Sequence, residues 1–120
     1  MKKIIIVDDS RTARMQGKNT LGGAGFEIVE AVDGKDGIAK IEANTDASLV
    51  LCDVNMPNLG GLDMLDSLKE ETRSKLTFLM LTTEAEPRLV AKAKELGAKG
   101  WIVKPFKPEL LLAAVKKLAG

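Results

Sequence analysis

The chain has 120 residues, 45% of them hydrophobic, which is enough for one packed domain without disulfides; its single cysteine, Cys52, favours a reducing, cytoplasmic location. No apolar run approaches the roughly 18 residues that cross a membrane, and the run after Met1 is too short for a signal peptide. The formal net charge is +1, but residues 27–71 hold eleven acids and three bases whereas residues 88–117 hold two acids and eight bases, which is typical either of a face for a charged partner or of solvated helices.

The first β/α unit pairs an apolar strand with a weak helix. Residues 4–7 are a β-branched run that ends at two aspartates. The following helix, about residues 11–24, would face the sheet with little apolar bulk, at Ala13, Gly17, Thr20, Leu21 and Ala24. Because an interior glycine costs a helix about 1 kcal/mol relative to alanine, we expect a marginal helix that lies close to the sheet.

The middle of the chain continues the alternation of strand and helix. Residues 27–31 alternate between apolar and polar side chains, which is typical of an edge strand, and a helix follows at about residues 35–43. Residues 49–52 are an uninterrupted apolar run. The next helix would be lined by Leu62, Met64, Leu65 and Leu68.

The last two units follow the same plan and complete the fold class. Residues 78–81 and 101–103 are apolar runs, followed by helices at about residues 87–97 and 108–119, each opened by a proline. Runs without alternation indicate parallel strands that helices cover on both faces. We therefore predict an α/β protein, one domain over residues 1–120, with a three-layer, doubly wound, five-stranded parallel sheet and right-handed crossovers.

Polar side chains follow the carboxyl ends of four of these strands: Asp8, Asp9, Asp53, Thr82 and Lys104. In an open parallel sheet such ends converge on one edge, where ligands bind. Each residue alone has a structural explanation, since acids cap helices, threonine is common in turns, and a lysine before proline is ordinarily solvated. Their coincidence at four core-strand ends favours a functional site.

The chemistry of this set points to a cation and a phosphoryl group. Clustered carboxylates repel one another, and a hard divalent cation such as Mg²⁺ removes that cost. A carboxylate can attack phosphorus and form an aspartyl phosphate, if positive charge and a hydrogen-bond donor meet the phosphoryl oxygens. Mg²⁺ and Lys104 would supply the charge, and Thr82 the donor. The chain has no histidine, and Cys52, in the middle of an apolar run, is interpreted as an inert core thiol.

With these residues in place, the chain resembles the response-regulator receiver domains, and among them the single-domain chemotaxis (CheY-like) type. The resemblance covers essentially the whole chain. Four motifs carry it, in this order: Ile6-Val7-Asp8-Asp9-Ser10, Asp53-Val54-Asn55-Met56-Pro57, Thr82-Thr83-Glu84 and Lys104-Pro105-Phe106. The resemblance implies the flavodoxin-like strand order 2-1-3-4-5.

The resemblance also implies the phosphoacceptor and the metal ligands. Asp53 would take the phosphoryl group from a histidine kinase or a phosphotransfer protein. Mg²⁺ would be bound by Asp9 and Asp53 directly, by Asp8 largely through water, and by the main-chain carbonyl of Asn55.

Further roles follow from the same resemblance. Lys104 would pair with the phosphoryl group, and Thr82 would move to hydrogen-bond it. Trp101 falls where the family has a switch tyrosine or phenylalanine. Asn55 and Glu84 match positions that tune the phosphoryl lifetime, and the peptide bond after Lys104 is expected to be cis.

Three positions depart from the family pattern. Trp101 is bulkier than the usual switch residue, so its inward packing would be harder. Gly60-Gly61 replaces an acid-glycine pair, which we expect to loosen the loop before the third helix. Gly17 stands where a core aliphatic residue is typical.

The last helix gives a clue about the partner. Leu111, Ala114, Val115 and Leu118 form an apolar stripe with Leu112 roughly opposite its centre. We expect a face around Trp101, Lys92, Lys99, Leu112 and Lys116 to bind an acidic, partly apolar helix or peptide. We expect no nucleic acid binding, because no residues remain for a DNA-binding domain, and no membrane insertion, because no apolar run is long enough. A monomer is favoured for want of an obvious apolar patch.

Two other classes of function fit the sequence less well. A phosphohydrolase of the haloacid-dehalogenase type would carry a second acid two residues after Asp53, where this chain has Asn55. A flavodoxin-like FMN carrier would need a hydroxyl- and glycine-rich loop after the first strand, where Asp8 and Asp9 would repel phosphate. We interpret the chain as a stand-alone response regulator that is not an enzyme beyond its own phosphorylation and autodephosphorylation.

Overall fold

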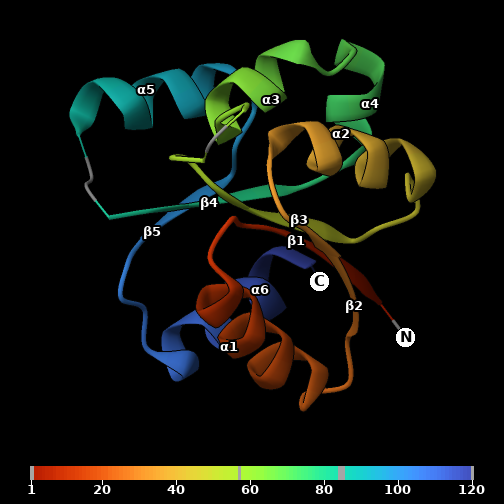
Figure 1. Cartoon of the computed structure of the whole chain (residues 1–120), viewed down its shortest axis with the longest axis vertical. Coiled ribbons are helices and arrows are strands. Elements are labelled where there is room, and N and C mark those ends of the chain that lie inside the picture. The colour runs from red at the N-terminus through yellow and green to blue at the C-terminus, as the bar shows by residue number, and fades with distance from the viewer. Residues whose placement is uncertain (1, 57, 84–85, 120) are drawn as a thin grey trace.

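In the computed structural model, which describes residues 2–56, 58–83 and 86–119, a five-stranded parallel sheet lies between two layers of helices (Figure 1). The strand order, β2-β1-β3-β4-β5, is the one expected, and β2 lies at an edge. The strands are β1 Lys3–Val7, β2 Glu27–Ala31, β3 Leu49–Asp53, β4 Phe78–Thr82 and β5 Gly100–Val103. All of their pairings are parallel.

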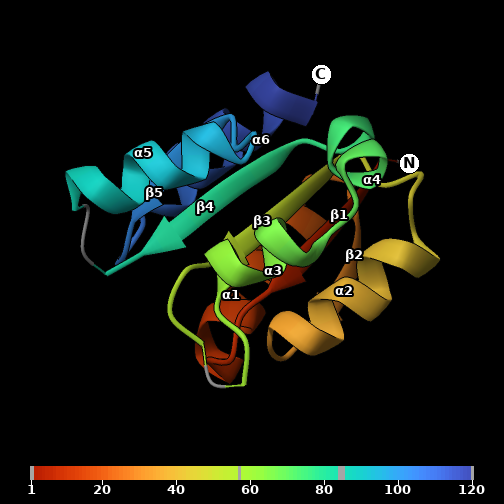
Figure 2. The same ribbon diagram turned by 90° about the horizontal axis from the view of Figure 1, so that it is seen from above.

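Six helices are seen in the same described residues: α1 Arg11–Gly22, α2 Gly34–Ala43, α3 Gly61–Ser67, α4 Glu70–Lys75, α5 Pro87–Glu95 and α6 Pro108–Ala119. One face of the sheet is covered by α1 and α6, and the other by α2 to α5 (Figures 1 and 2). None of the helices in the described part of the chain is long and apolar enough to cross a bilayer.

The strands build two separate apolar cores because successive side chains point to opposite faces of the sheet. Ile5, Val50 and Cys52 belong to the cluster under α2 to α5. Ile4 and Leu51 belong to the cluster under α1 and α6. This double burial explains why β1, β3 and β4 lack apolar/polar alternation.

The first helix is shorter than predicted, and its glycine has a packing role. It ends at Gly22 rather than residue 24, and Ala24, which was expected to face inward, is exposed. A Cβ atom at Gly17 would lie 3.0 Å from the Cδ1 atom of Ile6. The helix therefore lies close to the sheet, as expected, because position 17 carries no side chain.

The helix after β3 is broken, which the sequence pattern did not predict. It ends at Ser67 because Leu68 takes an extended backbone and buries its side chain, and the polar helix α4 starts two residues later. All residues of α4 are at least partly exposed, so no apolar periodicity marked it.

Candidate functional site

The carboxyl ends of the strands bring the predicted acidic residues together. Asp8, Asp9 and Asp53 each place one carboxylate oxygen so that the three atoms lie within 4.8 Å of one another. Asp8 and Asp53 are buried, whereas Asp9 is exposed and opens the cluster to solvent. The edge that carries this cluster is the one at the strand arrowheads in Figure 2.

Asp8 is fixed by contacts on three sides. Its Oδ1 atom accepts a hydrogen bond from the Ser10 main-chain N–H at 2.9 Å, and its Oδ2 atom accepts one from Lys104 Nζ at 2.6 Å. The guanidinium of Arg14 donates to the main-chain carbonyl of Asp8 at 2.7 Å, and it also lies 3.6 Å from a carboxylate oxygen of Glu30 on β2. Sequence reasoning missed Arg14, because a single arginine on a helix gives no signal of such a contact.

Asp53 is electrostatically unfavourable as an isolated anion. Its burial, together with the charge of Asp8, raises the pKa of Asp53 to about 6. Lys104, whose Nζ atom lies 3.3 Å from Asp53 Oδ2, and a hydrogen bond from the main-chain N–H of Asn55 act in the opposite direction. The site therefore favours a further cation next to Asp53.

Lys104 is held as a cation inside this cluster. Burial alone would lower the pKa of Lys104, but the hydrogen bond to Asp8 and the charges of Asp8 and Asp53 outweigh it and raise the pKa above its ordinary value. The peptide bond between Lys104 and Pro105 is cis, as expected.

Thr82 ends β4 in the same group, fully buried, and its carbonyl accepts a hydrogen bond from the main-chain N–H of Lys104. Asn55 lies beside Asp53 with its side chain exposed. Glu84, expected to tune the phosphoryl lifetime, lies outside the described residues. Cys52 is buried, which raises the pKa of its thiol and supports its interpretation as an inert core residue.

Trp101 is half-buried on β5 and packs against the core under α5. Its indole Nε1 atom is buried and has no hydrogen-bond partner among the described residues. On one side it lines a cavity of about 40 Å³ with Val90 and Ala93 of α5. On the other it lines an open groove of about 480 Å³ that also contains Phe106 and Leu110.

On the last helix, the exposed leucine is not the one that was expected. Leu112, expected to be exposed, is half-buried and packs against the core under α1 and α6. Leu110 is the exposed leucine, at 61%, and Val103 is exposed nearby. The assignment was wrong because the apolar stripe of α6 is wide enough to include position 112.

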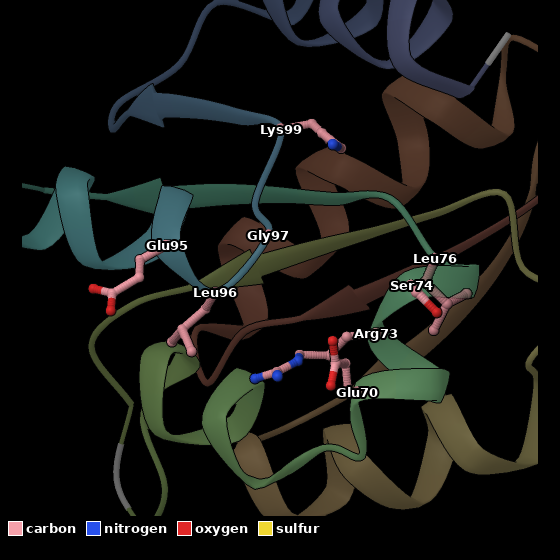
Figure 3. A pocket seen from close by; sticks show the side chains of 8 residues that line it. All are labelled: Glu70, Arg73, Ser74, Leu76, Glu95, Leu96, Gly97 and Lys99. Atoms are coloured by element: carbon pink, nitrogen blue, oxygen red, sulfur yellow. The ribbon is translucent and has the colours of Figure 1, made fainter.

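Lys99, the other residue expected on that face, lines a different hollow of about 350 Å³ (Figure 3). This hollow lies between α4 and the end of α5, next to the amino ends of β4 and β5, and so at the opposite edge of the sheet from Asp53. In Figure 3 the side chain of Arg73 extends towards Leu96, and its Nη1 atom donates to the Leu65 carbonyl at 3.0 Å. Two acids, Glu70 and Glu95, and two bases, Arg73 and Lys99, are among its lining residues, and it shares no residue with the acidic cluster.

The donor set of the cluster fits a hard divalent cation. Three carboxylates and one ammonium group leave an excess of negative charge, and all of the ligand atoms offered are oxygens. Oxygen-only coordination with retained water is what Mg²⁺ prefers in proteins. The exposed Asp9 leaves a side of the site open to such water molecules.

The fold and the cluster together define a doubly wound α/β protein with an acidic site at the carboxyl edge of its sheet. A model of the response regulator receiver domain family matches residues 4–116. The chain belongs to this family, whose members are signalling proteins rather than conventional enzymes.

Comparisons with individual proteins agree with this family assignment. Chemotaxis protein CheY1 of Helicobacter pylori is 37% identical over 120 residues, which cover 98% of this chain and 97% of that protein. The structure of the chemotaxis response regulator CheY4 of Vibrio cholerae matches with a TM-score of 0.90 and 36% identity over 98% of both chains. A CheX–CheY–BeF3–Mg²⁺ complex from Borrelia burgdorferi matches with a TM-score of 0.90 and 27% identity, over 97% of this chain and 87% of that one.

Proposed function

We propose that the chain is a chemotaxis response regulator, one receiver domain over residues 1–120, that accepts a phosphoryl group on Asp53 in the presence of Mg²⁺. The observation that carries this proposal is the meeting of Asp8, Asp9 and Asp53 within 4.8 Å, with Lys104 Nζ in contact with two of them. The 37% identity to a CheY protein over nearly the whole chain supports the choice of pathway.

In the proposed reaction, a carboxylate oxygen of Asp53 attacks the phosphorus atom of a phosphohistidine. The P–N bond breaks, and the imidazole nitrogen takes up a proton as it leaves. Asp9, Asp53 and the Asn55 carbonyl would hold Mg²⁺, with Asp8 bound largely through water. The ion would supply positive charge to the phosphoryl oxygens. Lys104 would transfer its ion pair from Asp8 to a phosphoryl oxygen.

The proposed switch joins the phosphoryl group to the surface at β5. The Thr82 hydroxyl would donate a hydrogen bond to a phosphoryl oxygen, and the space that it leaves would admit Trp101. A small cavity beside the indole, lined with Val90 and Ala93 of α5, leaves the ring room to shift within the core under α5. Asn55 and Glu84 would set the phosphoryl lifetime.

The proposed output surface centres on the groove lined by Trp101, Phe106, Lys107 and the exposed Leu110, and it extends to Lys92 and Lys116. Basic side chains around an apolar groove are suited to an acidic, partly apolar helix or peptide. The Borrelia complex shows a CheY bound to CheX, which supports regulation through protein contact.

The direct test is to add Mg²⁺ and acetyl phosphate and to measure intact mass. The native protein should gain the mass of one phosphoryl group, and Asp53→Asn should gain none. A native protein that stays unmodified, or an Asp53→Asn variant that is modified equally, would exclude Asp53 as the acceptor. Catalytic turnover of a phosphorylated metabolite would instead favour a phosphohydrolase.

A further inference from the structure

Two hydrogen bonds join the loop after β3 to the start of α2. The side-chain amide of Asn58 donates to Asp33 Oδ2 at 2.8 Å, and the main-chain N–H of Gly34 donates to the Leu59 carbonyl at 3.0 Å. The loop, described at residues 54–56 and 58–60, carries Asn55, whose main-chain N–H contacts the Asp53 carboxylate. The contact with α2 and the candidate site therefore involve the same short loop.

The close approach of the two segments depends on a missing side chain. A Cβ atom at Gly34 would lie 2.3 Å from the Leu59 carbonyl oxygen, far inside van der Waals contact. At the far end of the loop, a Cβ atom at Gly61 would lie equally close to the Asp53 carbonyl oxygen. Gly60 and Gly61 let the loop lie against the end of β3, and the expected loosening of the loop stays a prediction.

Asn58 has a backbone conformation that requires compensation. Its φ angle of 68° lies in the left-handed region, where asparagine is better tolerated than most residues but still disfavoured. Both carboxylate oxygens of its partner Asp33 accept a hydrogen bond. Oδ1 accepts from the Asp36 main-chain N–H at 2.8 Å, as the cap of α2, and Oδ2 accepts from Asn58. These two hydrogen bonds, that of Asp36 first, lower the pKa of Asp33.

We propose that Asp33 and Asn58 are positioning residues for the Mg²⁺ site. They hold the tip of the loop against α2, and the loop in turn holds the main chain of Asn55 against Asp53. Asp33 acts through Asn58, and Asn58 acts through Asn55; neither needs to touch the ion. This inference rests on the proposed function, because it assigns the two residues to the site that function requires.

The test measures Mg²⁺ affinity of the unphosphorylated protein by calorimetry, together with the lifetime of the phosphorylated form. Asn58→Gly removes the hydrogen bond, accepts the positive φ angle and leaves the net charge unchanged. Asp33→Asn keeps a good helix cap but turns one amide donor towards the donor of Asn58. We expect each to weaken Mg²⁺ binding by about five-fold, the effect of one ordinary hydrogen bond.

The exchange Asp33→Asn with Asn58→Asp restores the hydrogen bond in the reverse direction, since the amide at position 33 then donates to the carboxylate at position 58. It has the same net charge as the native protein. We expect it to recover Mg²⁺ affinity to within about two-fold. Asn58→Gly and the exchange variant both keep the native net charge, so the difference in Mg²⁺ affinity between these two reports the hydrogen bond and not the loss of a carboxylate.

Asn44→Gly is the matched control, because Asn44 also makes side-chain hydrogen bonds, at the far end of α2 from the site. It should lower the thermal midpoint and leave Mg²⁺ affinity unchanged. The inference is overturned if Asn58→Gly binds Mg²⁺ as the native protein does, or if the folded exchange variant binds as weakly as Asp33→Asn. Failure of the native protein to bind Mg²⁺ would instead overturn the proposed function, and this inference with it.

Discussion

Lys104 Nζ lies 2.6 Å from Asp8 Oδ2, closer than its 3.3 Å from Asp53 Oδ2. The ammonium group therefore pairs more closely with Asp8 than with Asp53. Lys104 and a metal ion are in part alternative ways to neutralise the carboxylates. Lys104 should therefore oppose metal binding but assist phosphoryl acceptance.

Lys104→Met should separate these effects. Removing the ammonium group should strengthen Mg²⁺ binding by about three- to ten-fold, since a nearby positive charge is lost. The same change should slow phosphoryl acceptance by about a hundred-fold, because the positive charge that would stabilise the transferred phosphoryl group is lost. Calorimetry with Mg²⁺ and the rate of modification by acetyl phosphate measure the two. A weaker Mg²⁺ affinity would contradict the competition between lysine and metal.

Asp53→Asn should stabilise the metal-free protein above about pH 6. A carboxyl whose pKa is raised on folding binds more protons in the folded state, so stability falls as pH rises from about 4 to 6 and stays reduced above it. Removing that charge should raise the free energy of unfolding at pH 8 by about 1–3 kcal/mol. Urea unfolding in EDTA at pH 4 and pH 8 gives the comparison; an equal difference at both pH values would contradict this origin.

Trp101→Phe should reduce the free energy of unfolding by less than the loss of buried apolar surface suggests. The substitution removes a buried N–H group that has no partner among the described residues, and such a group costs about 1–3 kcal/mol. We expect a net loss below about 1 kcal/mol, against about 2–4 kcal/mol for Trp101→Ala. Equal losses for the two variants in urea unfolding would show that the indole nitrogen is satisfied in solution.

The amides of α1 should exchange with solvent faster than those of α6, although the two helices have the same length of 12 residues. Only Gly17 and Leu21 of α1 are buried, whereas α6 buries two large side chains, Leu111 and Val115. Local opening follows the number of buried apolar contacts. Hydrogen exchange followed by mass spectrometry tests this, and equal protection would show that packing of Gly17 on Ile6 compensates.

The strands and the acidic cluster were predictable because both depend on short-range pattern plus one topological rule. Apolar runs end at Val7 and Cys52, and the convergence of parallel strand ends then brings Asp8 and Asp53 together. The break before α4 was not predictable, since Leu68 continues the helical spacing of Leu62 and Leu65. In the structure its backbone is extended and its side chain is buried. The contact of Asn58 with Asp33 spans 25 residues and follows from no periodicity.

Leu51 and Cys52 are neighbours in the chain but belong to different apolar clusters, whereas Leu51 shares its cluster with Leu111, sixty residues away. Energetic coupling should therefore follow the faces of the sheet and not the order of the chain. In double-mutant cycles, Leu51→Ala with Cys52→Ala should be nearly additive, and Leu51→Ala with Leu111→Ala should show an interaction of about 0.5 kcal/mol or more. We therefore expect the sheet to act as a partition between the two apolar cores.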